Sequence, residues 1–190
     1  MSFAERRRFL WICFFFLLAL LALTAALTNA TTLARMTFDA LVQQSSAVAR
    51  LRCLGSEYRW DRGELWTDTR FELIEASKGS LPAVLTVRTI GGISGPLHSR
   101  VDGVPIFRTG EEVYLFLWER PGQPYRVFGW AQGTFRILRN EQAGTETVTQ
   151  DSAAAPLFDP RTRTFRHGGI RSLPIAVFQL KLRRALEHQN

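Results

Sequence analysis

The run Gly110-Glu-Glu-Val-Tyr-Leu-Phe-Leu-Trp118 predicts the fold of the chain. Its residues from Val113 to Trp118 are all apolar or aromatic, and the run is too short for a helix of ordinary length. Turn residues bound it, since Gly110 precedes it and Pro121-Gly122 follows it. A short apolar run of β-forming residues is typical of a strand that is covered on both faces. We therefore expect 113–118 to be the central strand of a β-domain.

Further strands are predicted on both sides of this run, at 47–56, 65–75, 84–90, 125–130 and 134–139. In the first of them Ala49, Leu51 and Cys53 alternate with two arginines, so these three side chains share one face. Thr37 can cap a short helix over 37–46, and apolar residues at helical spacing predict a second helix over 174–188. The predicted fold class is all-β. It is a small antiparallel OB-like barrel of five or six strands with both helices packed on it.

Residues 1–30 have the features of an export signal. Arg6-Arg7-Arg8 precede an apolar run from Phe9 to Leu27, and Thr28-Asn29-Ala30 offers small residues for cleavage. The apolar run is also long enough to span a bilayer, so an uncleaved N-terminal anchor is the alternative. Either form places the remaining chain outside the cytoplasm, as a periplasmic, secreted or inner-membrane-anchored protein. The predicted parts that follow are a β-barrel domain at 37–139, a mobile polar linker at 140–155, and a peripheral hairpin with the C-terminal helix at 156–190.

The composition is that of a globular chain. Of the 190 residues, 46% are hydrophobic and 22% are charged, which excludes a disordered protein. The formal net charge of +7 favours acidic partners. The two cysteines are Cys13, which lies in the apolar N-terminal run, and Cys53. This excludes a disulfide-stapled scaffold and makes Cys53 a buried free thiol.

No cofactor or metal is expected. His98, His167 and His188 lack the spacing of zinc ligands, and the chain has no phosphate-binding loop or dinucleotide motif. Two arrangements could serve a hydrolase: His98 beside Ser99, and the carboxylates of Asp68 and Glu72 on one strand face. Adjacent residues of a chain rarely face each other, and Arg70 between the carboxylates favours an ion ladder across strands. A hydrolase is therefore the least favoured alternative, and the chain is not expected to be an enzyme.

The segment 91–107 is the longest irregular stretch of the predicted domain and is rich in glycine and proline. Loops of this length within compact domains are often functional. We therefore expect a non-enzymatic interaction module that binds an unidentified protein partner through this loop. The candidate residues are Gly91, Gly92, Ser94, His98, Arg100, Asp102 and Phe107.

A second candidate surface is a stacking face made of tryptophan and arginine. Its members are Trp60, Trp66, Arg70 and Trp130, and Trp118, Arg59 and Arg126 extend it. Such faces bind sugars or single-stranded nucleic acid, and an exported protein favours a glycan or other anionic polymer over nucleic acid. The alternative is that the tryptophans close the ends of the barrel. Contact with a membrane is expected only through residues 9–27, if they are not cleaved.

Several pieces between Phe38 and Leu138 resemble a recurrent pattern in bacterial exported proteins of unknown function. They include Thr37-Phe-Asp-Ala-Leu-Val42, Lys78-Gly79, Pro105-Ile-Phe107 and Gly110-Glu111-Glu112. The order of the strands, with Phe107-x-x-Gly-Glu111 before the apolar strand, also resembles the netrin and tissue-inhibitor-of-metalloproteinase module. That resemblance implies an OB-type barrel and a protease-associated role. The inhibitors of that family use an N-terminal cysteine and several disulfides, which this chain lacks, so inhibition by their mechanism is not expected.

Overall fold

Strand β6, Glu112–Trp118, is the central strand that the sequence predicts. It belongs to a computed structural model that describes Trp11 and residues 33–188 of the chain. Strand β6 pairs with β1 on one side and with β8 and β7 on the other, all antiparallel. Its residues from Glu112 to Leu117 are buried. Burial of every residue along the run, rather than of alternate residues, requires a cover on both faces of the sheet.

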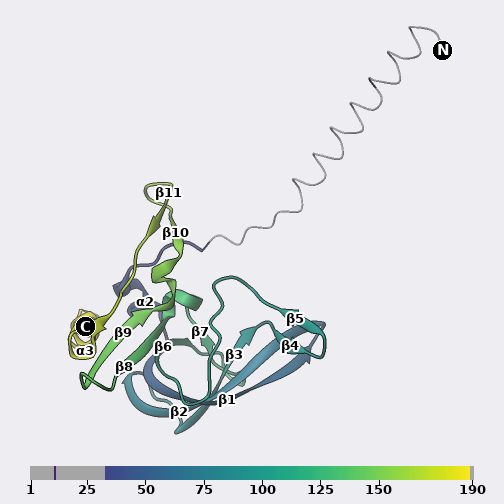
Figure 1. Cartoon of the computed structure of the whole chain (residues 1–190), viewed down its shortest axis with the longest axis horizontal. Coiled ribbons are helices and arrows are strands. Elements are labelled where there is room, and N and C mark those ends of the chain that lie inside the picture. Colours follow the sequence, from purple (N-terminus) through teal and green to yellow (C-terminus); the bar gives the residue numbers. More distant parts are fainter. Residues whose placement is uncertain (1–10, 12–32, 189–190) are drawn as a thin grey trace, which may run out of the picture. The chain divides into compact units, whose positions relative to one another are not determined.

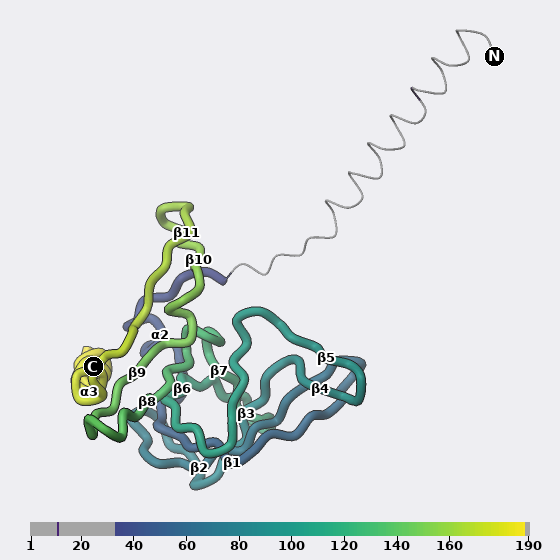
Figure 2. The backbone as a smooth tube through the Cα atoms, viewed as in Figure 1, coloured from purple at the N-terminus to yellow at the C-terminus, as the bar shows by residue number. Residues whose placement is uncertain are grey.

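Two helices and twelve strands make up the part of the chain between Leu33 and His188 (Figures 1 and 2). The helices are α2 (Phe38–Gln44) and α3 (Ile175–Glu187). The longest strands are β1 (Ala47–Asp61) and β2 (Glu64–Lys78). The others are β3 (Val84–Ile90), β4 (Gly92–Ser94), β5 (Leu97–Ser99), β7 (Arg126–Val127), β8 (Thr134–Asn140), β9 (Thr145–Gln150), β10 (Pro156–Asp159), β11 (Thr164–His167) and β12 (Leu173–Pro174). Short 3-10 helices cover Trp130–Gly133 (η1) and Asp151–Ala154 (η2).

The predicted all-β class with two packed helices is confirmed, but the closed barrel is wrong. Eight strands form one antiparallel sheet in the order β12-β9-β8-β6-β1-β2-β3, with β7 also beside β6, and this sheet does not close into a barrel. Its last strand, β3, meets the segment before β7 only at an isolated bridge between Val87 and Tyr125. Strand β7 is two residues long because Pro121-Gly122 and Pro124 precede it, and proline donates no ladder hydrogen bond.

The sheet carries a hydrophobic cluster on each face. Val113, Leu115 and Leu117 of β6 belong to the inner cluster, together with Phe71 of β2. Side chains of a strand alternate between faces, so the intervening Tyr114 and Phe116 enter the outer cluster. Both helices cover this outer face, through Leu41, Val42, Phe178, Leu182 and Ala185. The predicted strand 125–130 is reduced to β7, because η1 begins at Trp130.

A β-bulge at Gly55 changes the direction of the side chains along β1. Up to Cys53, the odd-numbered residues face the inner cluster, as predicted. Cys53 is opposite Phe71 but Gly55 is opposite Arg70, so Leu54 is the extra residue of the bulge. Ser56 and Thr69 are opposite each other beyond it, and their hydroxyl oxygens lie 2.8 Å apart. From that point on, the even-numbered residues of β1 face inward.

Residues 140–155, where a mobile linker is predicted, contain β9 and η2 instead. Strand β9 pairs with β8 over six positions, from Gln150 opposite Phe135 to Thr145 opposite Asn140. Its residues alternate threonine with other side chains, and Val148 enters the outer cluster. The peripheral hairpin expected at the start of 156–190 is formed by β10 and β11, and the C-terminal helix is α3.

The Lys78-Gly79 pair at the end of β2 fixes the position of α2. The Nζ atom of Lys78 donates to the carbonyl oxygens of Val42 at 2.7 Å and Gln43 at 3.2 Å, at the C-terminal end of the helix. Cations suit this end because the last carbonyl groups of a helix have no partner within it. Gly79 has φ +75°, and a Cβ atom there would lie 2.8 Å from the Ser46 carbonyl oxygen. Glycine is therefore required at this turn.

Candidate functional site

The loop 91–107 folds back over the inner face of the sheet, where β1 ends and β2 begins (Figure 2). Strands β4 and β5 form a short hairpin in it that lies beside these ends. The amide of Gly91 donates to the Leu65 carbonyl oxygen at 2.8 Å, and the Thr67 hydroxyl donates to the Gly91 carbonyl oxygen at 2.7 Å. A Cβ atom on Gly92 would lie 2.6 Å from the Tyr58 ring, so the glycines allow this close approach.

A cavity of about 280 Å³ lies between this loop and the sheet. Hydroxyl side chains line its sheet side, and they come from Ser56, Tyr58, Thr67, Thr69 and Thr89. Apolar side chains also line it, from Ile90, Val101, Val104 and Phe107, and the loop adds His98, Ser99 and Arg100. Phe107 is buried and its ring packs edge-on against Phe71, with the ring centroids 5.0 Å apart. Hydroxyl groups beside apolar groups suit an amphipathic ligand group.

Arg136 of β8 fixes the end of the loop to the sheet. Its guanidinium donates to both carboxylate oxygens of Asp151, at 2.6 and 2.7 Å, and also to Glu111. It donates to the Ile106 carbonyl oxygen at 3.0 Å as well, and lies 5.8 Å from the centroid of the Phe107 ring. Burial opposes the charge on this guanidinium, but the hydrogen bonds to Asp151 and Glu111 outweigh it and raise the pKa of Arg136. Arg136 therefore holds the end of the loop that covers the cavity.

Large hydrophobic side chains stand exposed around the mouth of the cavity. Ile106 is 63% exposed, and Tyr58 and Ile93 are also exposed. All three are lining residues of the cavity. Trp60 is 54% exposed and donates from Nε1 to the Ser94 hydroxyl at 3.0 Å, and Leu97 opposite Ser94 is exposed too. Exposed apolar groups that are contiguous with a cavity mark interaction sites more often than isolated ones do.

The structure brings most of the predicted loop residues to this cavity. Gly91, Gly92, His98, Arg100 and Phe107 line it, whereas Ser94 binds Trp60 and Asp102 is exposed in a turn. His98 and Ser99 are consecutive residues of β5, opposite Ile93 and Gly92, so their side chains point to opposite faces of the hairpin. This arrangement does not favour a nucleophile and base pair.

The predicted stacking face is divided between the two faces of the sheet. Because of the bulge at Gly55, Trp60 points inward toward β4, whereas Trp66 is opposite Arg59 and points outward. Arg70 also points outward, four residues from Trp66, which is about 13 Å along a strand. The interpretation of Trp60, Trp66, Arg70 and Trp130 as one face is therefore wrong. The bulge at Gly55 reverses the alternation for the rest of β1, and this places Trp60 on the inner face.

Trp66 and Trp130 do come together, around Arg126. The Arg126 guanidinium lies 4.9 Å from the centroid of the Trp66 ring, in a cation–π contact. Two hollows, of about 190 and 410 Å³, share Arg126, Val127 and Trp130 as lining residues. Trp118 lines the larger hollow. Trp130 has φ +52°, an uncommon and costly conformation for a bulky side chain.

Asp68 and Glu72 are engaged in ion pairs on the outer face of β2. Both oxygens of Asp68 accept from Arg88, at 2.6 and 2.8 Å, and Glu72 pairs with Arg52 at 3.1 Å. The hydrogen bond to Asp68 is the largest effect on Arg88, and it raises the pKa of that guanidinium. The ion ladder is thus the better description of these carboxylates.

Within Trp11 and residues 33–188, no three His, Cys, Asp or Glu side chains gather as a metal site. The same residues include no helix with the length and hydropathy to cross a membrane. The predicted export segment at 1–30 lies outside the described residues apart from Trp11, so export stays a prediction.

Comparisons with protein-family models, with curated proteins and with solved structures give no match to this chain. The resemblance to exported proteins and to the netrin and metalloproteinase-inhibitor module therefore stays a prediction. Functional inference depends on the geometry of the sites alone.

Proposed function

We propose that the chain is an exported, non-enzymatic interaction module that binds a protein partner at the cavity beneath residues 91–107. The observation that carries this proposal is the cavity of about 280 Å³ with exposed Ile106, Ile93 and Tyr58 at its mouth. The volume is near the lower end of that of small-molecule pockets, about 300 Å³, and gives room for one anchoring side chain.

An apolar or aromatic side chain of the partner would serve as the anchor in the cavity. Full burial of such a side chain contributes about 1.5–3 kcal/mol, and anchors of this kind dominate many interfaces. The hydroxyl groups of Tyr58 and Thr89 can bond the polar backbone beside the anchor, while those of Thr67 and Thr69 already bond Gly91 and Ser56. Because Arg136 and the two glycines already hold the loop in place, little ordering cost is left for the moment of binding.

Site-specific photo-crosslinking tests the proposal in the expressing host. A benzoyl-phenylalanine at Ile106 should form one discrete protein adduct. The matched control is the same residue at Val84, which is also apolar and exposed but lies at the start of β3, away from the cavity. An adduct from both positions, or from neither, would argue against a specific site at the cavity.

A second variant separates use of the cavity from mere proximity. Ser99 lines the cavity and is half-buried, so Ser99→Trp should fill it and abolish the adduct from position 106. Ser80→Trp, at an exposed position outside the cavity, makes the same chemical change and should leave the adduct intact. If Ser99→Trp has no effect, the partner binds the rim without entering the cavity, and the anchor proposal fails.

A second candidate function is the binding of an anionic glycan around Arg126. The cation–π pair of Arg126 with Trp66, and the strained Trp130 in the adjoining hollow, favour it. Aromatic stacking contributes about 1–3 kcal/mol per ring contact in the related case of nucleic-acid bases. Retention on an anionic polysaccharide column should then fall with salt and be lost in Trp66→Ala. Trp60→Ala, on the other face, is the matched control and should elute like the parent chain.

A further inference from the structure

The hairpin of β10 and β11 stands away from the eight-stranded sheet as a separate two-stranded sheet (Figure 1). Residues 160–167, its turn and outer strand, are all exposed. Phe165 is 62% exposed and its ring contacts Phe158, with the centroids 5.5 Å apart. The Asp159 carboxylate fixes the turn by accepting from the amides of Arg161 at 3.0 Å and Thr162 at 3.4 Å. An ordered hairpin thus presents an aromatic ring to solvent.

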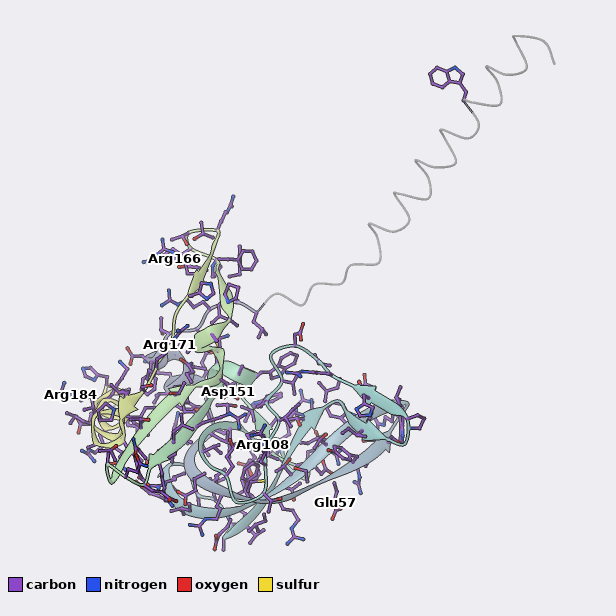
Figure 3. The ribbon with its side chains drawn as sticks, in the orientation of Figure 1. Glu57, Arg108, Asp151, Arg166, Arg171 and Arg184 are labelled. Atoms are coloured by element: carbon purple, nitrogen blue, oxygen red, sulfur yellow. The ribbon has the colours of Figure 1, made fainter. Side chains whose placement is uncertain are left out.

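Its arginines differ from those of the main sheet. Arg50, Arg88 and Arg136 are each held by carboxylates. The hairpin has three arginines, Arg161, Arg163 and Arg166, and no carboxylate of the described residues forms an ion pair with any of them. Figure 3 shows Arg166 on the hairpin, apart from Asp151 of η2 and Glu57 of β1. The positive charge of the hairpin is therefore available to an external anion.

The base of the hairpin is joined to the start of the described domain. The amide of Arg35 donates to the Phe158 carbonyl oxygen at 2.7 Å, and the amide of Phe158 donates to the Leu33 carbonyl oxygen at 3.1 Å. Ala34 and Phe158 form a parallel bridge. The apolar run ends at Leu27, and the residues 28–32 that separate it from Leu33 span at most about 20 Å when extended. In a chain that keeps this run in a bilayer, the base of the hairpin lies within that distance of the membrane.

We propose that the β10–β11 hairpin docks on an anionic bilayer surface, in a chain whose residues 9–27 remain as an uncleaved anchor. Phe165 lies in the interfacial region of the lipid, where aromatic side chains are favoured. Arg161, Arg163 and Arg166 contact the lipid phosphates. The hairpin then gives the domain a second attachment to the membrane, which restricts its orientation there. This surface is separate from the cavity and independent of the function proposed for it.

The test uses the full chain, 1–190, in lipid nanodiscs, with Cys13→Ser and Cys53→Ala to leave one labelling site. An environment-sensitive fluorophore is placed at Thr162→Cys, in the turn of the hairpin. Its emission should shift to shorter wavelength in discs of phosphatidylglycerol and phosphatidylcholine, compared with discs of phosphatidylcholine alone. The matched control is Glu57→Cys on β1, whose emission should be equal in both discs.

Substitutions on the hairpin show whether charge causes the docking. Each of Arg161→Gln, Arg163→Gln and Arg166→Gln should lower the docking equilibrium about fivefold, since one arginine near an anionic surface contributes about that factor. Equal emission at 162 in both discs would overturn the proposal, as would a shift that survives loss of all three arginines. A shift caused by soluble anionic polysaccharide but not by anionic lipid would assign the hairpin to a glycan instead. A mature chain that begins near Thr31 would remove the anchor and overturn the proposal too.

Discussion

Cys53 is buried beneath the central strand, between Leu51 and the bulge at Gly55. Burial raises the pKa of its thiol, and thiolate is the reactive form. We therefore expect slow reaction with a thiol reagent in the native state and complete reaction after unfolding, measured in a Cys13→Ser background. Cys53→Ser should cost about 1–3 kcal/mol in the free energy of unfolding, because it places a polar hydroxyl in the inner hydrophobic cluster.

Cys53→Ala is the control for this prediction, since it removes the sulfur without adding a polar group. It should cost less than Cys53→Ser. Fast labelling of the native protein, or a dimer that disappears with reductant, would contradict the burial of Cys53. The alternation of Ala49, Leu51 and Cys53 is sufficient to predict this residue, because the first half of β1 pairs with β6 without a shift in register.

Glu112 is a buried carboxylate that lies among three arginines. Its side chain is 8% exposed and accepts from Arg50 at 2.7 Å, Arg52 at 3.0 Å and Arg139 at 3.1 Å. Burial alone would raise the pKa of Glu112, but the hydrogen bonds from Arg50 and Arg52 outweigh it and leave the pKa below its ordinary value of 4.5. The two carboxylates of the Gly110-Glu111-Glu112 sequence thus stabilise the sheet. Glu111 binds Arg136, and Glu112 binds the three other arginines.

A carboxylate with a lowered folded pKa stabilises the fold above its unfolded pKa. That stabilisation is lost as pH falls through the folded value. Glu112→Gln should therefore lower the free energy of unfolding by about 2 kcal/mol at neutral pH, a discounted value because two of the arginines are largely exposed. The difference from the parent chain should shrink as pH falls below 4.5. Urea unfolding between neutral and acid pH measures it, with the exposed Glu57→Gln as a control that should show little effect.

At the scale of the elements, Lys78 connects the end of β2 to the end of α2. Lys78→Met keeps the length of the side chain but loses both hydrogen bonds to helix carbonyls. We expect a loss of about 1.5–3 kcal/mol in stability, the usual value for hydrogen bonds to a charged group. Amide exchange should quicken in α2 more than in β6. Arg70→Met, at an exposed position of the same strand, should change neither; equal effects of the two variants would show that Lys78 has no specific role.

The bulge in β1 shows where prediction of the elements fails. The sequence indicates a strand at 47–56, but β1 continues to Asp61 with its alternation reversed after Gly55. A period of two holds only within an uninterrupted ladder, and a bulge shifts it by one residue. Leu54-Gly55 is the only local sign of the interruption. Without it, Trp60 falls on the wrong face, and the lining of the cavity by Ser56 and Tyr58 is missed.

At the scale of the whole domain, the class and the central strand could be predicted because they depend on local apolar patterns. Closure of the sheet could not, because it depends on the pairing of β3 with a segment that proline shortens to two residues. Strand β9 is not predicted from the sequence, because Val148 is its only apolar residue on the face that joins the outer cluster. The role of Arg136 depends on Ile106 and Glu111, from the segment before β6, and on Asp151 of η2, so no local pattern indicates it.

The two hydrophobic clusters share β6, and this predicts a single cooperative unfolding transition. Phe178 of α3 belongs to the outer cluster and Leu51 of β1 to the inner one, and both are fully buried. Phe178→Ala should cost about 3–5 kcal/mol and Leu51→Ala about 2–5 kcal/mol. Each should shift the urea transition seen by tryptophan fluorescence and by far-ultraviolet circular dichroism to the same extent, because unfolding of either cluster exposes the opposite face of the same strand. In the contrary outcome, Phe178→Ala shifts the circular dichroism transition but leaves the fluorescence transition at the urea concentration of the parent chain. Two separate transitions of this kind would show that the outer cluster and its helices unfold independently of the inner cluster.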